Sequence, residues 1–144
     1  MIIKKINIEF TDDPNDIRNE GLGDYWDNPD GSRTIKVFCK NNSRMAINHA
    51  YACLFHEMYE HRKCEIDGVS EKDIDIFDAW HLKKGFEGEP GDHPSSIYRK
   101  QHRDAEFIER YIIDKFGEWW FDYEENYAIP EDFKYNENYG KDKS

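Results

Sequence analysis

The sequence has few of the features that mark a membrane-inserted or exported protein. Its apolar runs all fall short of the ~18 residues that suggest a transmembrane helix, and its first residues carry no signal-peptide pattern. It contains three cysteines, an odd number that favours free thiols over a disulfide framework. We therefore expect a protein of a reducing, cytoplasmic compartment that binds no membrane.

Basic residues are also scarce. The chain has 20 Lys and Arg against 31 Asp and Glu, which gives a formal net charge of -11. Nucleic acids and cytoplasmic membrane surfaces are polyanionic, so this balance disfavours both as partners. Metal ions, cationic partners and small molecules or peptides bound at a local site remain open.

Aromatic residues are abundant despite the polar composition. Nine Phe, nine Tyr and four Trp can fill a core within a chain of 144 residues, which is one domain's worth. We expect a single globular domain over residues 1–129 and a polar, flexible tail over 130–144. An aromatic cluster near the end of the domain is expected to fold back onto the core: Trp119, Trp120, Phe121 and Tyr123.

The first 40 residues predict a small sheet. Residues 2–10 and 33–39 have the β-branched, partly alternating pattern of strands. The turn Asn28-Pro29-Asp30-Gly31 predicts a hairpin that joins residues 24–26 to the second of these strands. We therefore expect an N-terminal antiparallel sheet.

The remainder has helical periodicity. Helices are predicted over about 44–66, 71–83 and 96–116. Ser70 and Asp73 resemble a capping box at the start of the second helix, and Gly85 is a plausible stop at its end. The expected fold class is α+β, with a small antiparallel sheet followed by three main helices.

The first helix carries an unusual set of residues. Placed on an ideal helix, residues 49–64 (HAYACLFHEMYEHRKC) separate into two faces. One face is apolar and is expected to meet the core: Tyr51, Ala52, Leu54, Phe55, Met58 and Tyr59. The other face holds residue types that bind transition metals and transfer protons: His49, Cys53, His56, Glu57, Glu60, His61 and Cys64.

The run His56-Glu57-x-x-Glu60 resembles the zincin motif H-E-x-x-H, with a Glu in place of the second His. In that motif two residues one turn apart bind Zn²⁺, and the intervening Glu polarises the attacking water. The resemblance makes His56 and Glu60 metal ligands and Glu57 the catalytic base, and the expected sheet followed by the motif helix fits a minimal zincin-like domain. Zinc is favoured over Mn²⁺ or Mg²⁺. The alternative is an ordinary surface helix with a His–Glu pair.

The other helices offer groups that can complete a site. Asp78 and His102 each lie beside an apolar stripe and are candidate third ligands, while Tyr98 is a candidate for steadying an oxyanion. Capping or hydrogen bonding is the simpler interpretation of Asp78 and His102 taken singly. The part played by five further residues stays open: His49, His61, His81, Glu106 and Glu109.

Beyond the helix motif, a set of segments resembles a group of short, uncharacterised phage and bacterial proteins. The shared pattern is roughly H-E-hydrophobic-x-E, a Cys, a Gly-Ile, F-D, G-E-P-G-D, a Tyr and a His, over about residues 24–125. Here it reads His56-Glu57-Met58-x-Glu60, Cys64, Gly68-Val69, Phe77-Asp78, Gly88-Glu89-Pro90-Gly91-Asp92-x-Pro94, Tyr98, His102, Ala105 and Glu109. The resemblance implies no established activity, but it supports grouping these residues, and a phage-encoded chain would act in the bacterial host cytoplasm.

Three functions follow as hypotheses. The first is a metal-dependent hydrolase, with peptide or amide cleavage as the guess from the zincin motif. The second is a Mg²⁺-dependent nucleotide (pyro)phosphohydrolase, because Glu57-x-x-Glu60 and Asp75-x-x-Asp78 resemble the E-x-x-E and E-x-x-D motifs of the all-α pyrophosphohydrolases. The third is a non-enzymatic acidic protein of phage type that binds and inhibits a basic host protein.

Overall fold

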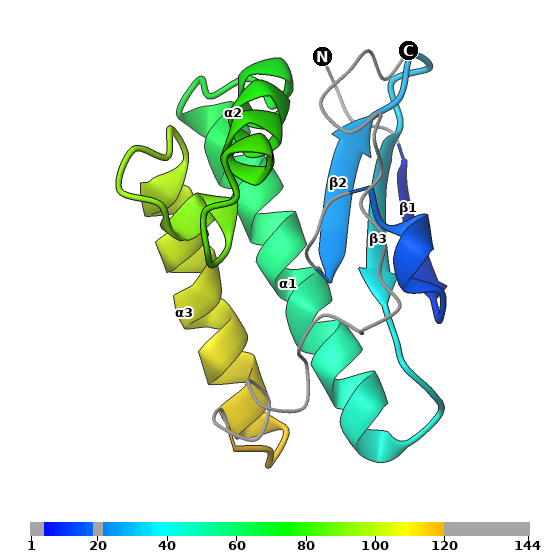
Figure 1. The fold of residues 1–144 in the computed structure, drawn as a ribbon. Coiled ribbons are helices and arrows are strands. Elements are labelled where there is room, and N and C mark those ends of the chain that lie inside the picture. The colour runs from blue at the N-terminus through cyan, green and yellow to red at the C-terminus, as the bar shows by residue number, and fades with distance from the viewer. Residues whose placement is uncertain (1–4, 19–21, 120–144) are drawn as a thin grey trace.

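The computed structural model describes residues 5–18 and 22–119 (Figure 1). In chain order its strands and helices are β1 (Ile6–Thr11), β2 (Gly23–Asp27), β3 (Arg33–Phe38), α1 (Arg44–Ile66), α2 (Glu71–Lys84) and α3 (Arg99–Lys115), with short 3-10 turns η1 (Pro14–Asp16) and η2 (Pro90–Asp92). The α+β prediction, a small N-terminal sheet followed by three helices, is confirmed. The expected tail at 130–144 and the aromatic residues at 120–123 lie outside the described residues. No helix in the described ranges is long and apolar enough to cross a membrane.

The sheet is mixed, which corrects the expectation of antiparallel pairing throughout. The predicted hairpin forms, with β2 antiparallel to β3 and Trp26 opposite Thr34. However, the strand order is β1-β3-β2, and β1 runs parallel to β3 with Ile8 opposite Ile35. The chain reverses direction between β1 and β2 and again in the hairpin, so the first and third strands point the same way. Because β3 takes the central position, these two strands pair.

Local signals in the sequence account for the ends of the helices. The Ser43 hydroxyl accepts a hydrogen bond from the Ala46 amide at the start of α1, and Ser70 does the same for the Asp73 amide in α2. Gly85 ends α2 in the left-handed conformation, with φ of 71°. The third helix begins at Arg99 instead of about 96, because Ser96 still belongs to a turn in which its amide donates to the His93 carbonyl.

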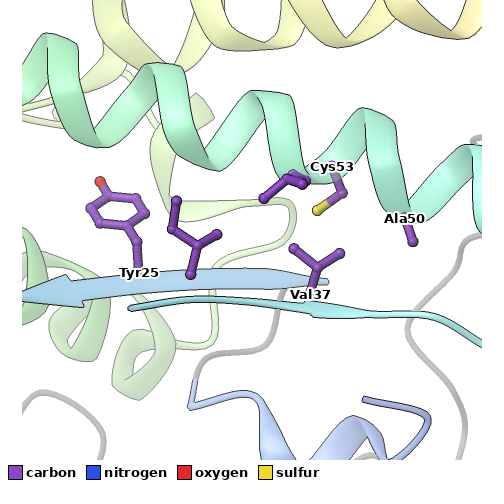
Figure 2. Close-up of a cluster of buried hydrophobic side chains, with 6 residues drawn as sticks. Tyr25, Val37, Ala50 and Cys53 are labelled. Atoms are coloured by element: carbon purple, nitrogen blue, oxygen red, sulfur yellow. The ribbon is translucent and has the colours of Figure 1, made fainter. Parts of the chain in front are cut away.

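Helix α1 lies between the sheet and α3 (Figure 1). On its sheet side, Ala50 and Cys53 pack against Tyr25 and Val37 (Figure 2). On its other side, Ala52 packs against Ile113 of α3. The helix is therefore covered on two sides, and residues on both sides must be compatible with burial.

The expectation that the apolar face of α1 meets the core is confirmed only in part, by the buried Ala52 and Leu54. Tyr51 and Phe55, expected in the core, are 45% and 40% exposed. The residues of the other face are all buried instead: His49, Cys53, His56, Glu57, Glu60, His61 and Cys64. A buried His and Glu face is costly unless its members are paired or bind a cation. Trp119, also expected to pack on the core, is 63% exposed.

Candidate metal centre

Three buried side chains from two helices meet at the centre of the molecule. His56 and Glu60 lie one turn apart on α1, and His102 comes from α3. Glu60 Oε2 lies 3.1 Å from His56 Nε2 and 2.9 Å from His102 Nδ1. One ligand atom from each residue lies within 4.8 Å of the other two. Ligands at about 2.1 Å in a tetrahedral zinc site are about 3.4 Å apart, so this group could hold a metal ion.

Each of the two imidazoles also faces a second, outer carboxylate. His56 Nδ1 lies 2.7 Å from Glu109 Oε1, and His102 Nε2 lies 2.9 Å from Glu89 Oε2. Histidines that bind metals usually donate their other ring N–H to such a partner, which fixes the tautomer and aims the free nitrogen at the ion. Both rings therefore present their other nitrogen to Glu60, although only the contact of His56 with Glu109 is an aligned hydrogen bond.

Charges alternate through this group. Burial by itself lowers the pKa of an imidazole, but hydrogen bonds with Glu109 and Glu60 outweigh it and raise the pKa of His56 well above its ordinary value. The pKa of His102 is likewise raised, against burial, by its carboxylate partners. Burial opposes the ionisation of Glu60, yet hydrogen bonds from the two imidazoles lower its pKa. Without an ion, protons hold the group together, and a divalent cation can replace those protons.

Glu57 occupies the position next to the ligands without joining them. Its side chain is buried, and burial raises the pKa of its carboxyl group well above the ordinary value of 4.5. A Cβ on Gly23 of β2 would lie 2.7 Å from Glu57 Cγ and 2.9 Å from Cys53 Sγ. Glycine at this position therefore allows the strand to approach α1 and makes room for the Glu57 side chain.

A cavity of about 120 Å³ adjoins the centre. All six residues predicted for the site line it: His56, Glu57, Glu60, Asp78, Tyr98 and His102. Its walls also include further acidic side chains from four parts of the chain: Asp24, Glu71, Asp75, Glu89 and Glu109. Among the described residues, no Lys or Arg lines it. The cavity therefore favours cations and disfavours an anionic ligand that lacks a cation of its own.

Asp78 and Tyr98 line the same cavity as the histidines and bind each other. The Tyr98 hydroxyl donates to Asp78 Oδ1 at 2.6 Å, and both side chains are buried. Asp78 lies outside the group formed by His56, Glu60 and His102. The structure thus brings the predicted site residues to one cavity but groups only three of them closely enough to share an ion.

Of the five residues whose role was left open, the structure places one in the centre and the other four outside it. Glu109 contacts His56 and belongs to the centre. His49, His81 and Glu106 do not line the cavity. His61 forms a different group with Asp27 and Glu71.

That second group is a poorer metal site. The Arg33 guanidinium already donates to Asp27 Oδ1 at 2.8 Å and lies near enough to His61 to lower its pKa, an effect to which burial contributes more. An arginine cation at this position competes with a metal ion for the carboxylate. We therefore assign the candidate centre to the group around Glu60.

Two contributors were given no role by sequence reasoning. Tyr25 of β2 donates its hydroxyl to Glu60 Oε1 at 3.0 Å, which holds the second carboxylate oxygen. Glu89 lies in the G-E-P-G-D segment, whose composition marked it as distinctive without showing what it contacts. Only the packing of η2 against α3 reveals that this segment reaches His102.

No protein-family model, curated protein or solved structure matches the chain. The chemistry of the centre therefore has to be inferred from its own geometry.

Proposed function

We propose that this protein is a metal-dependent hydrolase whose ion is held by His56, Glu60 and His102. The observation that carries the proposal is the arrangement of the two imidazoles, each with one nitrogen on an outer carboxylate and the other on Glu60 Oε2. Two imidazoles and one carboxylate form a donor set that catalytic zinc sites use, whereas Mg²⁺ prefers oxygen ligands. Zinc is therefore the preferred ion.

Three protein ligands leave one tetrahedral position open for water, and a zinc ion lowers the pKa of such a water to about 7. Glu57 lies one residue after the first ligand and has a raised pKa, which suits a general base working near neutral pH. In this proposal Glu57 takes the proton from the attacking water. The bond cleaved is a peptide or amide bond, by analogy with the zincin motif.

Tyr98 has a supporting part in this scheme. Its hydroxyl proton is given to Asp78, so the same proton is not free for an oxyanion unless that bond opens. We assign Tyr98 to holding Asp78 in the cavity wall.

A second candidate, a nucleotide phosphohydrolase, has one observation in its favour. Asp75 and Asp78 of α2 line the same cavity as Glu57 and Glu60. Against it, no basic residue of the described chain lines that cavity, so the phosphates would depend entirely on bound Mg²⁺. Release of phosphate or pyrophosphate from nucleoside triphosphates with Mg²⁺, and not with Zn²⁺ alone, would favour this candidate over the first.

Metal analysis tests the proposed centre. Protein purified without added metal should contain close to one equivalent of zinc, or take it up on dialysis. His56→Ala, Glu60→Ala and His102→Ala should each remove it. His93→Ala is the matched control, because that histidine lies near the cavity without lining it. Absence of binding by the wild-type protein, or full binding by the Glu60 variant, would contradict the proposal.

Activity is tested separately from binding. A library of peptide and amide substrates should reveal hydrolysis that depends on zinc. Glu57→Gln should lower that hydrolysis by at least about 100-fold, the range of a positioned acid or base, while zinc content stays unchanged. If the Glu57 variant hydrolyses as fast as wild type, Glu57 is not the base.

A further inference from the structure

The G-E-P-G-D segment, residues 88–92, forms one wall of the cavity and includes η2, which packs against α3. We propose that this segment is a clamp that fixes the orientation of His102, with Glu89 and Asp92 as positioning residues and Gly91 as the point of contact. The contacts of the clamp with His102 do not depend on the proposed function. Its effect on zinc affinity does, because it requires His102 to be a zinc ligand.

Gly91 provides the closest contact between the segment and the ring. A Cβ at this position would lie 2.3 Å from His102 Cγ and 2.6 Å from its Nδ1. The φ angle of Gly91 is not positive, so its backbone could accommodate alanine. Glycine is therefore needed for the space it leaves. The backbone lies directly against the imidazole and blocks the ring from moving toward η2.

The two carboxylates hold the far edge of the same ring. Glu89 Oε2 lies 2.9 Å and Asp92 Oδ1 3.5 Å from His102 Nε2. By their charge these carboxylates favour a proton on Nε2, although no aligned hydrogen bond joins them to it. The lone pair of the neutral ring is then left on Nδ1, which is the nitrogen that faces Glu60. Backbone contact and charge thus act together on one ring, and each determines a different property, its position and its tautomer.

The same residues raise a competing assignment, since Glu89, Asp92 and His102 could themselves hold an ion. The side chains of Glu89 and Asp92 are 62% and 51% exposed, whereas that of Glu60 is 7% exposed. Exposed carboxylates remain well hydrated and gain little from an ion, while the buried group around Glu60 must be neutralised. We therefore place the ion at Glu60 and the clamp outside it.

The test uses the full chain in four variants. The double variant Glu89→Ala/Asp92→Ala removes both acceptors, and Glu89→Gln/Asp92→Asn keeps an oxygen at each position. Gly91→Ala adds a methyl group against the ring without changing any charge. Ser95→Ala is the control, because it changes an exposed residue of the same loop that does not line the cavity.

Two measurements are made on each variant: zinc affinity by competition with a chelator, and the His102 Nε2–H signal by nitrogen-correlated NMR of the metal-free protein. We expect zinc affinity to fall 10- to 100-fold in the alanine double variant and in Gly91→Ala, the range found for outer partners of metal-binding histidines. The amide double variant and Ser95→Ala should stay within about threefold of wild type. The Nε2–H signal should weaken or shift only in the alanine double variant and in Gly91→Ala.

The outcomes separate the two proposals. Loss of zinc from the amide double variant to the same extent as from the alanine variant would mean that Glu89 and Asp92 bind the ion themselves, which overturns the clamp. An unchanged Nε2–H signal in the alanine variant and in Gly91→Ala also overturns it. A changed signal in a protein whose wild type binds no zinc supports the clamp and contradicts the proposed function instead.

Discussion

Glu109 Oε1 of α3 lies 2.7 Å from Nδ1 of His56 on α1, and 53 residues separate the two in the chain. The contact fixes which nitrogen of His56 faces Glu60. Replacing Glu109 with Ala should therefore lower zinc affinity about 10- to 100-fold without removing a ligand. Asp114→Ala, an exposed carboxylate of the same helix that does not line the cavity, is the matched control and should leave the affinity unchanged. Equal affinities in wild type and Glu109→Ala, measured by chelator competition, would contradict this role.

The centre should contribute most to the stability of the metal-free protein at mildly acidic pH. The raised pKa values of His56 and His102 mean that their charged forms stabilise the fold fully below pH 6.5, and this contribution declines as pH rises toward the folded-state values. The raised pKa of Glu57 also lowers the free energy of unfolding as pH rises above 4.5, because its buried carboxyl group must then ionise. The lowered pKa of Glu60 acts oppositely, since its contribution is present above pH 4.5 and is lost as pH falls.

Urea denaturation across pH 4 to 9 in the presence of a chelator checks this expectation. Burial lowers the pKa of His49, His61 and His81, whose contribution is lost as pH falls below 6.5. The contribution of the centre is therefore taken as the difference between wild type and His102→Ala, which should be largest between about pH 4.5 and 6.5. Saturating zinc should offset the alkaline decline, because the ion replaces the protons of the histidines. A rise in this difference from pH 6.5 to 9 in the metal-free protein would show that these pairs do not govern it.

Gly23→Ala should impair catalysis more than metal binding. The added methyl group would lie 2.8 Å from Glu57 Oε1, so the carboxyl group must move, while the ligands on α1 and α3 remain untouched. We expect hydrolysis to fall at least tenfold with zinc content unchanged. Loss of zinc in Gly23→Ala together with the activity would point to a wider disruption of the fold.

Tyr98→Phe should destabilise the fold. The variant removes the hydroxyl that donates to Asp78 at 2.6 Å and leaves a buried carboxylate with one partner fewer. Such a loss costs about 1–3 kcal/mol. Tyr111→Phe makes the same chemical change at a residue of α3 that is 57% exposed, and it should have little effect. The two midpoints of chemical denaturation give the comparison, and coinciding midpoints would show that the Tyr98–Asp78 bond does not contribute.

Local features of the sequence predicted the elements well because local interactions determine them. Ser43 and Ser70 cap their helices through amides three residues away, and Gly85 ends α2 by its own conformation. The parallel pairing of β1 was not predictable in this way. It depends on which side of β3 the first strand reaches, and nothing in the residues of the strands themselves specifies that side.

The site was predictable in part for the same reason. His56 and Glu60 are one helical turn apart, so periodicity alone pairs them. The convergence of His102 depends on how α3 packs against α1, and the partnership of Glu109 with His56 depends on it as well. The orientation of α1 was predicted only in part because a helix covered on two sides has no single apolar face to read, and its aromatic residues can occupy the remaining exposed strip.

Glu60 and His102 lie 42 residues apart, and α2 and the 88–92 segment fall between them. An ion bound by both would cross-link the chain much as a disulfide does, closing a loop that contains α2. By the entropy of loop closure, a cross-link spanning that many residues restricts the unfolded chain by about 4 kcal/mol. The described cysteines form no disulfide, so the ion would be the cross-link of this small domain. Its removal would destabilise the packing of α2 together with the site.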